Sequence, residues 1–241
     1  APVSSVRSFM GRVSTTTTWS MGSIHPTVQE QLTSVSALGF HDNHPDGVFD
    51  PELSEWANDF SNETALFRTS GGGMCRINEF RRIGCGLHPS VRLNIYGTKA
   101  CFEQDGNGEL WTTHDRSIED VTERLRCYAP NAIAPDHAAR VEGHQVDSTT
   151  GMSQVHPVHR LPDELRVPPS GHMGSHHFLA DDFLRACETG TLPPNHAWQA
   201  ARYCVPGIVA HESARREGER LDIPDLGSPP GQWEHLAVDT T

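Results

Sequence analysis

Residues 171–226 read GHMGSHHFLADDFLRACETGTLPPNHAWQAARYCVPGIVAHESARREGERLDIPDL and contain the clearest helical pattern of the chain. A helix is predicted to begin just after Ser175, which is a suitable N-cap, and to stop at Gly190. Asp181 and Asp182 make one face polar, and apolar residues recur on the other at a spacing of about 3.6 residues. An amphipathic helix turns its apolar face toward the core. That face comprises Phe178, Leu179, Phe183, Leu184 and Cys187.

A second helical pattern occupies residues 195–217, and a last short strand is predicted over residues 219–225. Pro206 and Gly207 fall inside this helix, and an interior proline removes a backbone hydrogen bond, so we predict a kink or two stacked segments. The small side chain of Ser213 suits a close contact between helix and sheet. The predicted inward face comprises Trp198, Ala201, Val205, Ile208, Val209 and Ser213.

The chain before these helices has the pattern of a β-sheet. Strands are predicted over residues 32–40, 64–70, 74–83, 91–104 (a pair) and 109–112, with a short helix over 117–125 and an irregular segment over 128–170. Gly71, Gly72 and Gly73 form the turn of a hairpin. Because the strands precede the helices, we predict an α+β fold, with an open, mainly antiparallel sheet and helices packed on one face.

Three segments of different character are predicted along the chain. Residues 1–30 are rich in Ser and Thr and are expected to be poorly ordered or atypical. Residues 31–226 form the α+β domain, and residues 227–241 are a tail rich in Pro and Gly.

Composition excludes several classes of protein. The net charge is −12, and 31 acidic residues oppose 19 basic ones, which argues against a nucleic-acid partner. No apolar run is long enough to span a membrane. The six cysteines form no CxxC pair, so neither a zinc ribbon nor a disulfide framework is indicated. Reduced thiols and the lack of a visible signal peptide predict a cytoplasmic protein.

Several segments together resemble the C-terminal domain of the Gfo/Idh/MocA oxidoreductase family, over about residues 32–226. They are GHMGSHHFLADDF, PGIVAHESARREGERLDIPDL, FSNETALFRTSGGGMCRINEFRRIG and YGTKACFEQ. The resemblance implies an open, mainly antiparallel sheet with helices on one face. It also implies that this domain shapes a substrate pocket and forms a dimer contact.

The family's other half is not found in this sequence. A Rossmann domain binds NAD(P) through a glycine-rich turn between a strand and a helix, and neither Gly71-Gly72-Gly73 nor Gly106-Asn107-Gly108 fits that context. The family's Glu-Lys-Pro motif is absent, and Lys99 lies in a predicted hairpin. Close relatives carry a Tyr-Pro-Thr-His segment before the first sheet strand, whereas this chain has only His25-Pro26-Thr27 there. The resemblance therefore implies NAD or NADP in the intact enzyme, no cofactor on this chain alone, and catalytic residues that stay unknown.

Histidines near the start of the first helix are candidates for substrate binding. The resemblance implies that a glycine-rich loop with His172 faces the substrate, and His176 follows it. Neutral imidazoles at a helix N-terminus can donate to sugar hydroxyls. The alternative is that these residues make the turn and pack. Zinc is a further alternative, with His211 or Glu212 as ligands, although no HExxH motif occurs.

Polar side chains along the predicted hairpin are the second set of candidates. Asn62, Arg76 and Glu79 can line a sugar pocket, because guanidinium and amide groups recognise hydroxyls. The alternative is a solvated face of the sheet with cross-strand ion pairs.

The leading hypothesis is the substrate-binding and dimerisation domain of an NAD(P)-dependent oxidoreductase that acts on a sugar, sugar acid or cyclitol. Such a chain is expected to be non-catalytic without a Rossmann partner, to bind a sugar-like small molecule and to form a homo-oligomer through its sheet. The alternative is a non-catalytic carbohydrate-binding or oligomerisation module.

Overall fold

A computed structural model describes residues 14–18, 30–53, 57–58, 60–82, 92–104, 108–125, 156–166 and 175–229, with residues 14–18 described by their backbone alone. The chain divides into two compact units. The first comprises residues 1–119 and 200–227, and the second comprises residues 120–199 and 228–241. The predicted irregular segment over 128–170 lies mostly outside the described residues, as does the predicted 1–30 segment apart from residues 14–18 and 30.

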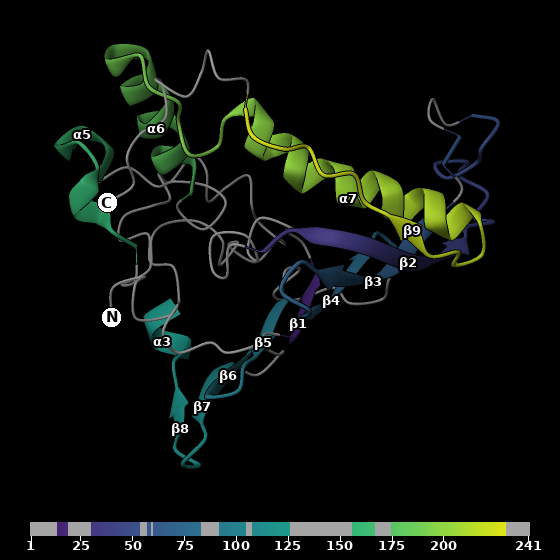
Figure 1. Ribbon diagram of the computed structural model, residues 1–241, viewed down its shortest axis with the longest axis horizontal. Coiled ribbons are helices and arrows are strands. Elements are labelled where there is room, and N and C mark those ends of the chain that lie inside the picture. The colour runs from purple at the N-terminus through teal and green to yellow at the C-terminus, as the bar shows by residue number, and fades with distance from the viewer. Residues whose placement is uncertain are drawn as a thin grey trace, which may run out of the picture. The chain divides into compact units, whose positions relative to one another are not determined.

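The described strands form one nine-stranded sheet in the order β8-β7-β6-β5-β1-β4-β3-β2-β9 (Figure 1). β1 pairs in parallel with β4. Six further pairs are antiparallel: β1–β5, β2–β3, β2–β9, β3–β4, β5–β6 and β6–β7. The mainly antiparallel, open sheet is therefore confirmed. The strands are β1 (Ser14–Thr18), β2 (Leu32–His41), β3 (Phe60–Thr69), β4 (Met74–Phe80), β5 (Arg92–Tyr96), β6 (Ala100–Gln104), β7 (Glu109–Thr113), β8 (Ile118–Asp120) and β9 (Leu221–Asp222).

β1 lies in the middle of this sheet, between β4 and β5. It falls inside the segment that was expected to be poorly ordered. Its sequence, STTTT, has no alternation of apolar and polar residues, but β-branched threonine suits a strand when neighbours on both sides offer backbone hydrogen bonds. Sequence periodicity gives no signal for such a strand.

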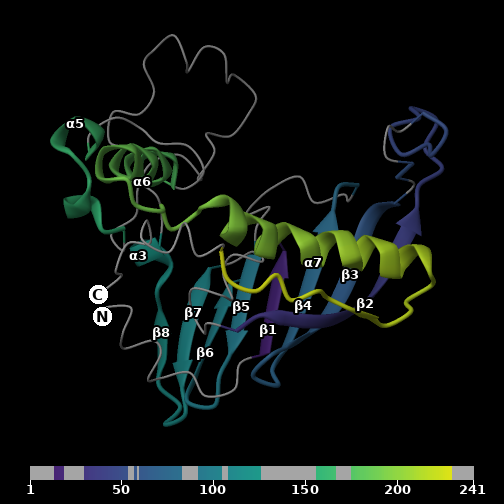
Figure 2. The same cartoon turned by 45° about the horizontal axis from the view of Figure 1, so that its top comes forward.

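The helices are α3 (Thr122–Leu125), η2 (Val158–Arg160), α5 (Asp163–Arg166), α6 (Ser175–Thr189) and α7 (Ala197–Arg215). α7 lies along β2 and β3 (Figure 2). It is one helix that contains Pro206, so the predicted alternative of two segments is wrong. Ile208, which was expected to face inward, is 68% exposed. Among the described residues no helix has both the length and the apolar character needed to cross a membrane.

The core lies between α7 and one face of β2, β3 and β4. Val35 on β2 pairs with Phe67 on β3, which pairs with Cys75 on β4, and all three are at most 2% exposed. Ala210 and Ala214 bring α7 onto this face. Side chains of a strand alternate between faces, so the intervening residues lie on the opposite, outer face. There Leu66 and Met74 are exposed.

The burial of α6 is the reverse of the prediction. Leu179, Phe183 and Leu184 are 45–62% exposed, whereas Asp181 is 3% exposed. Arg185, one turn further along, donates from Nε to the Asp181 carboxylate at 2.9 Å, so the buried charge has its partner. Helical periodicity shows which residues share a face, but it does not show which face meets the rest of the protein.

Candidate functional site

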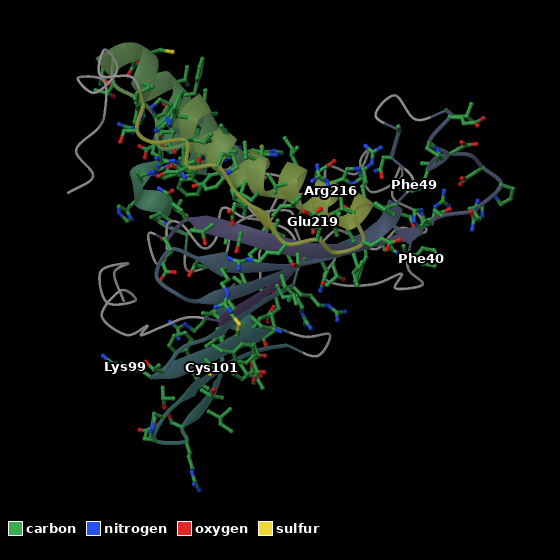
Figure 3. The ribbon with its side chains drawn as sticks, turned by 45° about the vertical axis from the view of Figure 1, so that its right-hand side comes forward. Phe40, Phe49, Lys99, Cys101, Arg216 and Glu219 are labelled. Carbon is green, nitrogen blue, oxygen red and sulfur yellow. The ribbon has the colours of Figure 1, made fainter. Side chains whose placement is uncertain are left out.

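A pocket of about 550 Å³ lies where β3 begins and β4 ends. The β2–β3 loop borders it, and Figure 3 labels Phe49 in that loop. Both apolar rings and charged groups line it, which is typical of sites for small polar molecules. The lining residues are Val48, Phe49, Asn58, Phe60, Ser61, Glu63, Glu79, Arg81 and Arg82.

Two carboxylates face one another in this pocket. Glu63 on β3 is the register partner of Glu79 on β4. Both lie on the same face as the core residues, because each is an even number of positions from a buried neighbour on its strand. Like charges directly opposite each other are unfavourable unless other groups compensate them, so the partners of each carboxylate decide the chemistry of the site.

His211 on α7 contacts Glu63. Its Nδ1 lies 2.7 Å from Glu63 Oε1, and both side chains are about one quarter exposed. The Phe60 ring meets His211 edge-on, with the ring centroids 5.6 Å apart. Gly39 makes room for that ring, because a Cβ at this position would lie 2.4 Å from the Phe60 ring. The pair therefore has an imidazole held in one orientation by a carboxylate.

Arg81 compensates Glu79, with Nε 2.5 Å from Oε1. Burial raises the pKa of Glu79 above its usual value, Arg81 opposes this, and the neighbouring Glu63 adds to it. Carboxylates accept hydrogen bonds from hydroxyl groups, and guanidinium groups donate them. The pocket thus has hydrogen-bond donors and acceptors side by side.

Arg82 holds the β2–β3 loop beside the pocket. Its guanidinium donates two hydrogen bonds to Asp46, at 2.6 and 2.7 Å, and its Nε lies 2.9 Å from Asp42. The hydrogen bond from Arg82 lowers the pKa of Asp46 to about 2. The side-chain amide of Asn62 holds the backbone of Arg82 through two hydrogen bonds of 3.0 Å. It accepts one from the Arg82 N–H and donates the other to the Arg82 carbonyl.

The structure brings few of the predicted site residues together. Glu79 lines the pocket, whereas Arg76, three residues earlier on β4, lies on the outer face. The side-chain amide of Asn62 is engaged by the Arg82 backbone. His176 is an exposed residue of α6 in the second unit, and His172 lies outside the described residues.

The pairing of Glu63 with His211 is the part of the site that sequence analysis missed. They are 148 residues apart, so no local pattern joins them. His211 was considered as an alternative zinc ligand. In the part of the chain that the structure describes, no three His, Cys, Asp or Glu side chains are grouped to hold a metal ion.

Replacing Glu79 by glutamine is expected to remove this residue's own destabilising contribution, which grows as the pH rises from about 4.5 to about 7. A carboxyl group whose pKa is raised by folding favours the folded state while it is protonated, and this advantage is lost as the pH rises through the folded-state pKa. Urea unfolding at both pH values measures the effect as the difference between wild type and variant. Glu52→Gln, in an exposed loop, is the control. Equal pH dependence of wild type and Glu79→Gln would contradict the prediction.

The described residues do not fit a nicotinamide dinucleotide. Gly71, Gly72 and Gly73 lie in the turn between the antiparallel strands β3 and β4, and no helix follows them. Gly72 has a φ of +83°, as a tight hairpin turn requires. Nowhere among the residues placed in the structure does a glycine-rich turn lead from a strand directly into a helix.

Comparison with known proteins identifies the fold. No protein-family model and no curated protein matches the chain. An oxidoreductase domain protein from Kribbella flavida matches with a TM-score of 0.53 and 12% identity, covering 92% of this chain and 64% of its own. Levoglucosan dehydrogenase in complex with NADH and levoglucosan matches with a TM-score of 0.52 and 14% identity, covering 90% of this chain and 60% of its own.

A third match is an oxidoreductase from Agrobacterium radiobacter in complex with NAD+, L-tartaric acid and magnesium. Its TM-score is 0.50 and its identity 13%, and it covers 92% of this chain and 61% of its own. The chain thus has a fold found in these oxidoreductases and spans 60–64% of their length. The sequence resemblance is confirmed at the level of the fold.

Proposed function

We propose that this chain is the substrate-binding and oligomerisation part of an NAD(P)-dependent oxidoreductase of the Gfo/Idh/MocA type. Its substrate is a sugar, sugar acid or cyclitol. The single observation that carries the proposal is the shared fold, because similar structures were solved with NADH and levoglucosan, and with NAD+ and L-tartaric acid. Fold alone does not define function, because function depends on the residues of a site.

The pocket between β3, β4 and the β2–β3 loop supports this proposal. Glu79 and Glu63 offer acceptors for hydroxyl groups, and Arg81 offers donors beside them. His211 is not a lining residue and acts on the pocket through Glu63, whose carboxylate it holds in place. Phe60 and Phe49 supply apolar contacts for the faces of a sugar ring. His172 and His176 remain proposed substrate contacts.

The cofactor is proposed to bind to a Rossmann domain outside these residues. The described part of the chain has no turn that fits a dinucleotide, and the similar structures are longer than this chain. We therefore propose that these residues alone bind substrate without oxidising it. A separate Rossmann-domain partner remains part of the proposal.

The outer face of the sheet is the proposed oligomer contact. Leu38 and Phe40 on β2 and Phe80 on β4 are exposed, and register places all three on this face around Asn62 and Thr64. Exposed apolar patches of this kind mark interaction sites. Sedimentation equilibrium checks this point, and a monomer at every concentration would contradict it.

The binding of a polyhydroxylated ligand is the test of the function. Isothermal titration of the chain with levoglucosan, myo-inositol and gluconate is expected to show at least one ligand with a Kd of about 1 mM or tighter. Glu79→Gln is expected to raise the Kd of that ligand by about tenfold, because the substitution removes a carboxylate acceptor from the pocket. Glu52→Gln, outside the pocket, is the matched control and should bind like wild type.

Dehydrogenase activity is the second measurement. NADH formation with the bound ligand is expected only when a Rossmann-domain protein is added to the chain. If no member of the panel binds, the substrate proposal fails. If a sugar binds but no Rossmann-domain protein restores activity, the chain is instead a carbohydrate-binding module.

A further inference from the structure

The outer face of the sheet has a second hollow, at the opposite end of β2, β3 and β4 from the apolar patch. Its volume is about 370 Å³. Arg68, Arg76 and Arg220 line it together with Ser34 and Ser36, and none of its lining residues is acidic. This grouping is unexpected in a chain with a net charge of −12. We call it the arginine groove.

Strand register brings the three arginines together. Arg68 on β3 pairs with Met74, and Arg76 on β4 pairs with Leu66, so the two arginines are diagonal neighbours on one face. Such neighbours have Cα atoms about 7–8 Å apart, within the reach of long side chains. Arg220 precedes β9, and its Nε donates to Ser34 Oγ at 3.3 Å, where Ser34 is the register partner of Arg68.

The nearby acids do not neutralise the groove. Within the described part of the chain, no ion pair joins Arg68, Arg76 or Arg220 to a carboxylate. Other arginines there do form such pairs with Asp or Glu. Glu103 on the same face accepts a hydrogen bond from the Tyr96 hydroxyl at 2.9 Å. Asp222, opposite Ser34, makes no ion pair with these arginines.

We propose that the arginine groove binds a small anion that carries a phosphate or carboxylate group. Guanidinium groups match both in geometry and form short, charge-assisted hydrogen bonds with them. Ser36 adds a hydroxyl donor, whereas the buried Ser34 hydroxyl holds Arg220 in place. The exposed side chains of Leu66 and Met74, which also line the groove, contact the carbon skeleton of the ligand. This inference does not rest on the proposed substrate pocket, because Glu63 and Glu79 of that pocket lie on the opposite face of the sheet.

Titration of the chain with inorganic phosphate and, separately, with citrate tests the proposal and distinguishes the two anion chemistries. The measurement is made at constant ionic strength and at a concentration where sedimentation shows a monomer. At least one anion is expected to bind with a Kd of about 1 mM or tighter. Arg76→Gln and Arg68→Gln are each expected to raise the Kd of that anion by about tenfold.

Two further variants make the result specific. Arg216→Gln removes an exposed arginine that pairs with Glu212 at the end of α7, and it should bind the anion like wild type. Arg76→Lys keeps the charge but loses the planar fork, so binding should weaken less than in Arg76→Gln. Circular dichroism confirms that each variant is folded.

Three outcomes would overturn the proposal. One is the absence of binding by either anion at about 10 mM. Another is anion binding that is equally strong in all variants. If Arg76→Gln instead leaves anion binding unchanged and prevents self-association, the groove pairs with acidic groups of a second copy, and the proposal is also wrong.

Discussion

Replacement of Phe67 by alanine is expected to lower the free energy of unfolding by about 3–5 kcal/mol. Phe67 on β3 is 2% exposed and lies between Val35 on β2 and Cys75 on β4. Ala210 and Ala214 of α7 cover this face, and these small side chains cannot move in to fill the space that a phenyl ring leaves. The cost therefore includes the lost burial and a cavity.

Urea unfolding followed by far-UV circular dichroism measures this change. Ile118→Ala is the matched control, because Ile118 on β8 is 71% exposed. The control should change stability by less than about 0.5 kcal/mol. A loss below about 1 kcal/mol in Phe67→Ala would show that the core between α7 and the sheet is not packed as described.

Replacement of Ser213 by alanine is expected to lower the free energy of unfolding by about 2–4 kcal/mol, although it removes a single oxygen atom. Ser213 is fully buried. Its hydroxyl accepts a hydrogen bond from the Ala37 N–H at 2.9 Å and donates one to the Glu219 carbonyl at 2.6 Å. β9 pairs with β2 only at Ser34 and Val35, so Ser213 supplies the acceptor that a longer β9 would have supplied to Ala37. Alanine leaves both backbone groups without that partner, and an unsatisfied buried polar group is costly.

The backbone amide of Ala37 gives a specific readout for this variant. Its hydrogen exchange should accelerate in Ser213→Ala by more than that of the other β2 amides, because its acceptor is lost. Ser228→Ala, at an exposed position, is the control and should leave stability and exchange unchanged. If the Ala37 amide of Ser213→Ala exchanges at the same rate as in the wild type, the role assigned to the Ser213 hydroxyl is wrong.

Local patterns in the sequence determined the strands on either side of the Gly71–Gly73 turn, both long helices and the α+β class. These features depend on residues close together in the chain, where alternation, helical spacing and turn-forming glycines act directly. Alternation also separates Arg76 from Glu79, since residues three apart on a strand face opposite sides. That signal was present in the sequence, although the prediction placed both residues in one pocket.

Tertiary structure decided what depends on partners distant in the chain. The parallel pairing of β1 with β4, the His211–Glu63 pair and the Ser213–Ala37 hydrogen bond join segments far apart in sequence. The exposure of the apolar face of α6 depends likewise on what surrounds the helix. Periodicity describes one element by itself, whereas register and packing between elements determine which side chains meet. The sequence by itself therefore determined most of the elements and the class of fold, although not β1 or β8, and only the tertiary structure assembled the pocket and the arginine groove.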